Sequence, residues 1–376
     1  FEMKIKTITC HDVYNYGASL QAYALLHFLN ISGHNVEIID YLPNKNRRRY
    51  DYFRLASTGF LRKVADLCPF SEPFLALWQN RWEILGRKRK LNFDKFKCEY
   101  LKCTELKYTT FSDLKNNKPS ADFFVAGSDQ IWNVSYGNGL DPAFYCAFED
   151  DCNKRISYAA SFGSSTIPEE SVDFIKKMLS GFKAISVRET SGVKIINSLG
   201  LDAFHVLDPV FLLEKEVWST LCRKSENKNY VLVYDFLHND PTIEYVAKQL
   251  AKKYKLKIVS LNDFKPLLYA DENVNNAGPI EFLEYVKNAG YVISSSFHAT
   301  AFSVIFSREF YTFPLVGHGN SARMEDFLGM LGLSDRFIHS EDSFVESSDI
   351  DYKQVDQIIN EKRNLSRNWL LDQLKY

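Results

Sequence analysis

The sequence predicts an α/β protein of two domains, each built on a parallel sheet with helices against its faces, with a helical insertion in the first domain. The length of 376 residues exceeds what one hydrophobic core usually organises, so two domains are expected. Short apolar strands alternate with helical patterns twice, over 4–41 and over 230–313. With 45% apolar and 15% aromatic residues, the composition excludes an intrinsically disordered chain.

The first domain, expected at 3–212, begins with a strand–helix–strand unit. Residues 4–9 alternate and are rich in β-branched side chains, and residues 19–31 repeat apolar side chains at helical spacing. An apolar run at 36–41 follows, which favours parallel pairing of the two strands. The region 45–107 is expected to be a mostly helical insertion. Further strands are expected at 123–127, 156–161 and 184–188.

The second domain is expected at 213–350 and repeats the alternation of apolar runs and helical patterns. The remaining residues, 351–376, are expected to form a C-terminal helix, and one arrangement has it pack back on the first domain. Strands are expected at 230–234, 256–260, 291–294 and 310–313, and helices at 241–254, 279–288, 324–331 and 352–371.

Charge is distributed unevenly along the chain. The formal net charge of −1 argues against a nucleic-acid partner. The segment from Lys45 to Lys107 nevertheless holds 16 lysines and arginines against 7 acidic residues, a net charge of +9. One interpretation is a solvated helical face, and the other is peripheral contact with a membrane surface or an anionic acceptor. The aromatic residues among these charges are Tyr50, Tyr52, Phe53, Trp78 and Trp82.

The cysteines and the hydropathy of the sequence indicate the cellular compartment of the protein. The 7 cysteines lack the spacing of a disulfide scaffold, so we expect free thiols in a reducing cytoplasm. No stretch reaches the roughly 18 apolar residues of a membrane span, and no signal peptide opens the chain. We therefore expect a cytoplasmic protein, located at the inner face of the membrane if the basic segment binds lipid.

Ligands of parallel α/β sheets bind at the carboxyl ends of the strands, so the residues after each strand are the candidates. The glycine motifs that bind phosphate or dinucleotides are absent there, which gives no support to an NTPase or a dinucleotide enzyme. The spacings typical of zinc sites and the G-x-S-x-G elbow of hydrolases are absent as well. We expect no metal and no bound cofactor.

Three features after strands suit an anionic ligand. The run Ser-Ser-Ser-Phe-His at 294–298 stands between a strand and a helix, where free N–H groups, hydroxyls and an imidazole suit phosphate or carboxylate. Arg188 follows another strand, and Arg323 opens a helix after a Gly/Asn/Ser turn. The structural alternatives are a hydrogen-bonded turn with a structural His298, an ion pair of Arg188 with Glu189, and a solvated Arg323.

A fourth feature suits a sugar. The run Gly-Ser-Asp-Gln-Ile-Trp-Asn at 127–133 concentrates hydrogen-bonding groups beside Trp132, and sugars stack an apolar face on aromatic rings. Asp129 could serve there as the general base for a sugar hydroxyl. The structural alternative is an Asx-type turn with Trp132 in the core.

Five motifs in chain order resemble the polysaccharide pyruvyl transferase family. Each is weak alone, but their order and their positions at strand ends make the combination specific. The resemblance extends from about Lys4 to about Arg336 and omits the insertion. The motifs are NYGASLQAYAL at 15–25, GSDQIWN at 127–133, SVRE at 186–189, LDPV at 207–210 and SSSFH at 294–298.

The resemblance implies a glycosyltransferase-B-like fold with two facing Rossmann-like domains. It also implies transfer of pyruvate from phosphoenolpyruvate, a co-substrate, to two hydroxyls of a galactose-type sugar, either free or lipid-linked. The product is a cyclic ketal in a surface or capsular polysaccharide. Ser296 stands where other branches carry arginine, and Ala299 where glycine is common, so Arg323 is a candidate for the missing cation.

Roles follow from this resemblance together with the chemistry of the residues. We assign His298 as phosphate binder and general acid, Arg188 as clamp of the donor carboxylate or phosphate, and Asp129 as base or orienting group. The expected donor site is Arg188, Ser294, Ser295, Ser296, His298 and Arg323. The expected acceptor site is Asn15, Gly17, Ser128, Asp129, Gln130, Trp132 and Asn133.

Two other functions stay open at this point. One is a sugar-nucleotide glycosyltransferase of the same architecture, for which Glu281 and Glu325 are the candidates to hold a ribose. The other is a non-catalytic binder in a polysaccharide-assembly complex, which the departures at Ser296 and Ala299 keep open.

Overall fold

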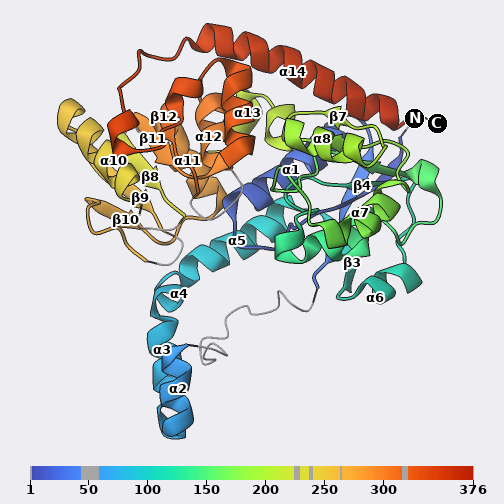
Figure 1. The fold of residues 1–376 in the computed structure, drawn as a ribbon, viewed down its shortest axis with the longest axis horizontal. Coiled ribbons are helices and arrows are strands. Elements are labelled where there is room, and N and C mark those ends of the chain that lie inside the picture. Colours follow the sequence, from blue (N-terminus) through green and yellow to red (C-terminus); the bar gives the residue numbers. More distant parts are fainter. Residues whose placement is uncertain are drawn as a thin grey trace.

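The computed structural model describes residues 2–43, 59–223, 229–236, 240–262, 265–315 and 321–375. Two five-stranded parallel sheets, one in each half of the chain, form the framework (Figure 1). The first has the order β3-β2-β1-β4-β5 and the second the order β10-β9-β8-β11-β12. Both orders reverse direction after the first strand of the sheet, as in mononucleotide-binding α/β domains.

The strands of the first sheet are β1 (Lys4–Ile8), β2 (Asn35–Tyr41), β3 (Cys103–Tyr108), β4 (Phe123–Ala126) and β5 (Arg155–Ser157). Those of the second are β8 (Tyr230–Tyr234), β9 (Lys257–Leu261), β10 (Glu272–Val274), β11 (Tyr291–Ser294) and β12 (Glu309–Thr312). A separate pair, β6 (Ser186–Val187) and β7 (Phe204–His205), adjoins the first sheet through single bridges from Ile156 and Ala160. The central strands are apolar on both faces because helices cover both, which is typical of parallel sheets.

Helices connect the strands. The first domain contains α1 (Tyr16–Ile31), α6 (Phe111–Asn116), α7 (Val172–Leu179) and α8 (Thr190–Ser198). The second contains α9 (Lys215–Leu221), α10 (Pro241–Tyr254), α11 (Pro279–Asn288), α12 (Phe297–Ile305) and α13 (Ser321–Leu331), and α14 (Tyr352–Gln373) ends the chain. The insertion forms α2 (Phe60–Leu67), α3 (Glu72–Gln79), α4 (Arg81–Leu85) and α5 (Arg87–Tyr100).

Local sequence explains where the helices at the centre begin. Asn15 caps α1 by accepting the N–H of Ala18 at 3.1 Å. Ser296 caps α12 by accepting the N–H of Ala299 at 3.4 Å. These polar side chains satisfy N–H groups that have no partner inside a helix. Both helices consequently start at the ends of β1 and β11, with their N-termini toward the space between the domains.

One apolar core runs through both domains. It joins residues of β1 and α1 to residues of β8, α11 and α12. At the junction, Tyr16 stacks on Phe282 with ring centroids 4.6 Å apart, and the Tyr16 hydroxyl donates to the carbonyl of Ala277 at 3.1 Å. The two halves are therefore packed together as well as linked.

Helix α14 packs back on the first domain and runs across both halves of the molecule (Figure 1). Arg363 donates through Nε to the carbonyl of Phe211 at 2.7 Å, and the hydroxyl of Ser366 accepts the N–H of Leu207 at 3.0 Å. At its other end, Tyr352 donates to the carbonyl of Arg308 in the second domain. The helix thus ties the two domains together.

The insertion differs from the expectation at its C-terminal end. Its helices end at Tyr100, and Cys103–Tyr108, which we expected within it, forms the edge strand β3 instead. Within the strand expected at 184–188, only Ser186–Val187 forms a strand, and Ala184 makes a single bridge to Ile156. Residues 44–58, which include Lys45, Tyr50, Tyr52 and Phe53, lie outside the described part of the chain.

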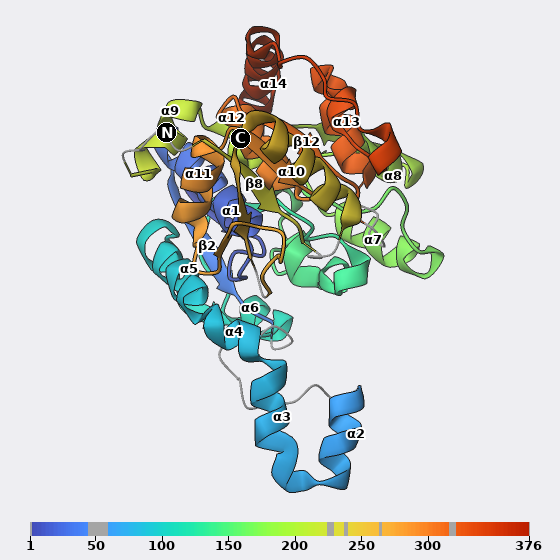
Figure 2. The same cartoon turned by 90° about the vertical axis from the view of Figure 1, so that its left-hand side faces the viewer.

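Helices α2, α3 and α4 project from the body of the molecule (Figure 2). We call residues 59–85 the arm. Helices α2 and α3 lie side by side, and the segment that connects them is at the far end of the arm (Figure 2). Among the described residues, no helix is both long and apolar enough to cross a bilayer. All 7 cysteines are free thiols.

Candidate active site between the domains

A cleft of about 620 Å³ lies between the two domains. Its walls come from the ends of β1 and β4 in the first domain and of β8 and β11 in the second. These are the strand pairs at which the order of each sheet reverses. The residues that line it are Cys10, Val13, Asn15, Ala18, Asp129, Gln130, Tyr136, Asn138, Phe236, Ser295, Ser296, Phe297, His298, Leu315 and Arg323.

The N-terminal ends of three helices meet at this cleft. Asn15 precedes α1, Ser296 precedes α12, and Arg323 lies in the first turn of α13, and all three line the cleft. Helix N-termini carry partial positive charge and unpaired N–H groups. The cleft therefore favours an anion even before side-chain charges are counted.

Arg188 lies behind the cleft wall in a cluster of carboxylates. Its Nη1 is 2.7 Å from Asp208 Oδ2, its Nη2 is 3.1 Å from Asp129 Oδ1, and its Nε is 3.8 Å from Glu189 Oε2. The Arg188 side chain is completely buried and does not line the cleft. The expected ion pair with Glu189 is present, but the shorter contacts are with Asp208 and Asp129.

The pKa values of this cluster follow from burial and charge. Burial opposes the charge of Arg188, but Asp129, Asp208 and Glu189 outweigh it and raise its pKa. Burial also opposes ionisation of Asp208, yet His298 and Arg188 hold the pKa of that carboxyl well below its usual range. For Glu189, burial dominates and raises the pKa. Asp208 is therefore the charged group that Arg188 and His298 share.

His298 stands at the cleft with its imidazole against the first turn of α1. Its Nε2 is 3.4 Å from Asp208 Oδ2, and its side chain is 10% exposed. A Cβ atom added at Gly17 would lie 1.9 Å from His298 Nδ1, so glycine is what leaves room for the ring. Gly17, expected in the acceptor site, thus contributes space for His298 and does not line the cleft.

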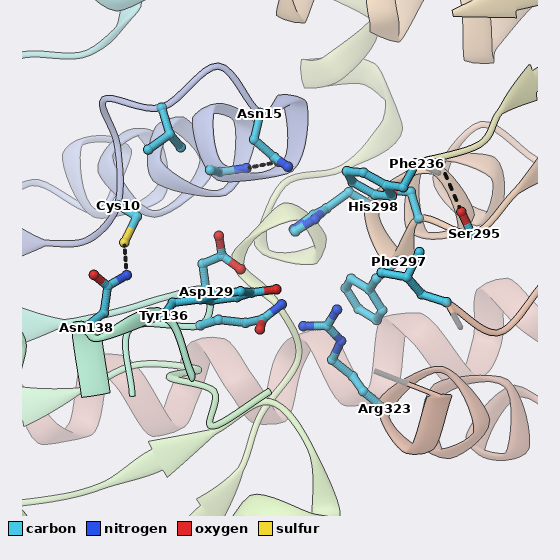
Figure 3. Close-up of a pocket in the computed structure, with 15 residues that line it drawn as sticks. Cys10, Asn15, Asp129, Tyr136, Asn138, Phe236, Ser295, Phe297, His298 and Arg323 are labelled. Atoms are coloured by element: carbon cyan, nitrogen blue, oxygen red, sulfur yellow. Dashed lines mark hydrogen bonds between the residues drawn. The ribbon is translucent and has the colours of Figure 1, made fainter. Parts of the chain in front are cut away.

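Arg323 is the cation that faces the cleft directly. Its Nε and Nη1 are buried and have no hydrogen-bond partner among the described residues. Burial and the nearby Arg188 lower its pKa to about 10. Its guanidinium lies 5.0 Å from the ring centroid of Phe297, and that of Arg188 lies 5.4 Å from the same ring. Figure 3 shows Arg323 and His298 pointing toward Asp129 from the opposite wall.

Asp129 and Gln130 line the wall of the first domain, as expected for an acceptor site. Trp132 does not, because its ring is fully buried and stacks on Tyr145 at 5.5 Å between centroids. The expectation that Trp132 offers a sugar-stacking surface is therefore wrong, and its structural alternative holds. The half-exposed ring at the cleft is that of Tyr136 instead.

Several residues that we expected in the binding site lie behind the surface of the cleft and do not line it. The hydroxyl of Ser128 donates to the carbonyl of Ala159, and the hydroxyl of Ser294 donates to the carbonyl of Tyr234. Asn133 donates to Gln130 and accepts from Ser135. Each is buried and hydrogen-bonded, so its polar groups are used within the wall.

Other cleft residues were missed by the sequence analysis. Asp208, which lies behind the cleft wall, was visible in the LDPV motif, where an acid directly follows a strand-like run, but its partners Arg188 and His298 come from other segments. Tyr136, Asn138 and Phe236 carried no motif that pointed to them. Cys10 also lines the cleft and accepts from Asn138 at 3.2 Å, but burial and nearby Asp129 raise its pKa, which disfavours a nucleophilic thiolate.

A group of side chains that could bind a metal ion lies in the first domain, apart from the cleft. His11, Asp40 and Cys103 bring one ligand atom each to within 4.8 Å of one another. A cation is already present there, because Lys97 Nζ is 3.0 Å from Asp40 Oδ1 and 3.1 Å from Asp12 Oδ2. A metal ion would have to displace this ammonium group.

The two acids considered for a ribose lie away from the cleft. Glu281 accepts the N–H of Gly278 at 2.9 Å and so caps its own helix. Glu325 is exposed on α13 and is not among the lining residues. Neither residue is placed to hold a nucleotide in the cleft.

Comparison with known proteins agrees with the fold and with the motifs. A family model described as polysaccharide pyruvyl transferase matches residues 15–314. No curated protein matches the chain. The S. aureus MnaA–UDP complex is similar in structure, with a TM-score of 0.50 and 10% identity over 96% of this chain and 87% of that one.

Two further solved structures have lower similarity. A Methanocaldococcus jannaschii UDP-GlcNAc 2-epimerase in complex with UDP-GlcNAc and UDP gives a TM-score of 0.47 at 12% identity, over 99% of both chains. The glycosyltransferase SnogD from Streptomyces nogalater gives 0.42 at 9% identity, over 98% of this chain and 96% of that one. Identities this low concern the fold alone. Two facing Rossmann-like domains of the glycosyltransferase-B-like kind are confirmed.

Proposed function

This chain belongs to the polysaccharide pyruvyl transferase family, and on that premise we propose that it transfers pyruvate from phosphoenolpyruvate to two hydroxyls of a sugar. The acceptor would be a galactose-type unit, free or lipid-linked, of a surface or capsular polysaccharide. The product would be a cyclic ketal. The observation that carries the proposal is that Arg323 lines the same cleft as His298 and has two nitrogens, Nε and Nη1, without a hydrogen-bond partner in the described part of the chain.

The donor requires two anion-binding features, because phosphoenolpyruvate carries a phosphate and a carboxylate. Arg323 offers one, with two donor nitrogens that have no hydrogen-bond partner among the described residues. His298 and the N-terminus of α12 offer the second. Arg188 is ion-paired with Asp208 and Asp129 and lies behind the cleft wall, so we assign it as a positioning residue that holds these two carboxylates rather than as the direct clamp.

The reaction balances with two protons. The acceptor's two oxygens bond to C2 of phosphoenolpyruvate, one acceptor proton goes to the methylene carbon to give a methyl group, and the C2–O bond to phosphate breaks. Phosphate leaves with the second proton. We assign His298 as the proton donor, with Asp208 near enough to stabilise the imidazolium, and we assign Asp129 on the opposite wall to orient or deprotonate a hydroxyl.

The wall of the cleft formed by the first domain, where we expect the acceptor to bind, has polar groups and the aromatic ring of Tyr136. Asp129, Gln130 and Asn138 offer oxygen and nitrogen atoms, and Tyr136 offers an exposed aromatic face. Sugars use this combination of hydrogen bonds and stacking. We therefore assign the stacking role expected of Trp132 to Tyr136.

Donor binding by Arg323 is tested by calorimetry with phosphoenolpyruvate alone. Arg323→Met should weaken binding about tenfold to a hundredfold, the cost of losing charged hydrogen bonds. The unliganded variant should melt no lower than wild type, because the substitution removes a buried cation with two nitrogens that make no hydrogen bond to the described residues, and it relieves the repulsion from Arg188. A variant that binds the donor normally would remove Arg323 from the donor site.

Catalysis is tested by phosphate release in a screen of sugar acceptors. His298→Asn should lower turnover by roughly 10²–10⁴-fold with a smaller change in donor affinity. Heat of binding with UDP-GlcNAc and none with phosphoenolpyruvate would favour the glycosyltransferase alternative. Heat with neither ligand would favour a non-catalytic binder.

A further inference from the structure

We propose that the arm is a docking element for an anionic membrane surface. The inference concerns how the protein is located and does not depend on the donor or on the reaction. It starts from which side chains the arm buries and which it exposes.

The arm buries a small apolar contact and exposes larger apolar residues. Ala65 and Ala76 are buried where α2 and α3 meet, with Leu61 and Leu75 packed against them. In contrast, Leu67 is 88% exposed and Phe70 90% exposed at the far end of the arm. A helical hairpin that faces water keeps most of its large apolar side chains inside. The large apolar residues left outside indicate that another apolar phase covers them.

The exposed apolar residues form a continuous stripe from the far end of the arm. Phe70, Phe74 and Trp78 are spaced four residues apart, which places them on one side of the chain in its helical turns. Leu67 lies on the neighbouring turn of α2. Trp78, at the last turn of α3, extends the stripe toward α4, and we call Leu67, Phe70 and Phe74 the apolar tip. Its position at the end of a projection lets it reach a surface before the body does (Figure 2).

Basic residues lie between the tip and the body. Lys63 is one turn before Leu67, and Arg87 and Lys88 are exposed at the start of α5. Arg81 lies over the Trp78 ring at 4.2 Å. An apolar end with cations behind it matches the order of acyl chains and anionic headgroups in a membrane leaflet.

The same charges argue against a second copy as the occupant. Residues 59–85 hold three basic and three acidic residues, and Arg62 pairs with the acids Asp66 and Glu72. The excess positive charge lies at the base of the arm, at the exposed Arg87 and Lys88, and two arms in contact would bring these cations together. Like charges placed together oppose association. An anionic lipid surface instead gains about 1 kcal/mol for each basic residue near it.

Flotation of the full chain with vesicles tests the proposal. Wild type should float with vesicles of phosphatidylcholine mixed with phosphatidylglycerol, and more weakly with phosphatidylcholine alone or at high salt. Leu67→Ser combined with Phe70→Ser should reduce the bound fraction roughly tenfold or more, because both side chains leave the apolar phase. Leu268→Ser is the matched control, since Leu268 is 98% exposed on the second domain, and it should float like wild type.

A second variant separates charge from apolar insertion. Lys63→Glu with Arg87→Glu and Lys88→Glu should lose binding to the phosphatidylglycerol vesicles while keeping the melting temperature of wild type. Failure of wild type to float, or equal flotation of the tip variant, would overturn the proposal. So would a wild-type dimer in light scattering that the tip variant converts to monomer, because the arm would then be an interface between copies.

Discussion

At the residue scale, the cleft depends on one carboxylate, Asp208, which Arg188 and His298 share. Arg188 approaches one of its oxygens at 2.7 Å, and His298 approaches the same oxygen at 3.4 Å. The other oxygen accepts the N–H of Val210 at 3.1 Å, which fixes the carboxylate. Because Asp208 is buried, its charge stabilises both partners strongly, and removing it would leave Arg188 with less compensation.

Asp208→Asn should therefore destabilise the protein in a pH-dependent way. The pKa of Asp208 is lower in the folded protein than in the unfolded chain. The carboxylate therefore adds its full share to the free energy of unfolding above the ordinary pKa of about 3.9, and this stabilisation is lost as the pH falls through the folded-state pKa. We expect a loss of about 3–5 kcal/mol in the free energy of unfolding at neutral pH. Urea unfolding at neutral and acidic pH measures it, and a gap between the two proteins that does not narrow in acid would contradict the assignment.

At the element scale, the approach of α1 to α12 sets the position of the imidazole. The two helices start at the ends of strands in different domains and meet where Gly17 faces His298. No other residue type fits, because a Cβ would overlap the ring. The contact between the two helices therefore requires a residue without a side chain at position 17, whereas the helix itself does not.

Gly17→Ala should displace the His298 ring and lower both stability and turnover. Overpacking of this kind costs about 1–3 kcal/mol. Gly329→Ala on α13 is the control, because a Cβ there meets only Ser334 Oγ at 3.9 Å. That change should stabilise the protein by about 0.5–1 kcal/mol, the usual gain of alanine over glycine in a helix. Thermal melts and phosphate release compare the two, and similar behaviour of both variants would refute the contact.

At the scale of the whole molecule, the two domains share a core, so the cleft is held by packing on both sides. Tyr16 on α1 stacks on Phe282 of α11 and makes an edge contact with Tyr234 of β8. Helix α14 binds both halves in addition. Domains with large apolar contacts between them unfold together.

Calorimetry should accordingly show one unfolding transition for the wild type. Tyr16→Ala should separate it into two, since it removes the central ring of the junction at a cost of about 3–5 kcal/mol. Tyr108→Ala is the matched control, because Tyr108 is equally buried but lies within the first domain, where it donates to the carbonyl of Asn117. This variant should melt at a lower temperature in a single transition. Two transitions in the wild type would show that the domains are independent.

The order of strands and helices could be predicted from the sequence because it rests on local patterns. Alternation and helical spacing are properties of neighbouring residues, and they located β1, α1, β8 and α10 within a few residues. The strand β3 was missed because an edge strand can be polar, and its central residues Glu105, Leu106 and Lys107 are exposed. The motifs after strands likewise identified Asp129, His298 and Arg323 as residues of one cleft.

The sequence by itself determined the two α/β domains and the chemical groups that stand at the strand ends. Only the tertiary structure decided which of these groups are available to a ligand. Arg188 and Arg323 were both candidates for the donor site, yet Arg188 is ion-paired with Asp129 and Asp208, whereas Arg323 has two nitrogens that find no hydrogen-bond partner among the described residues. The physical reason is that burial and pairing depend on contacts between residues far apart in the chain, which local patterns do not encode.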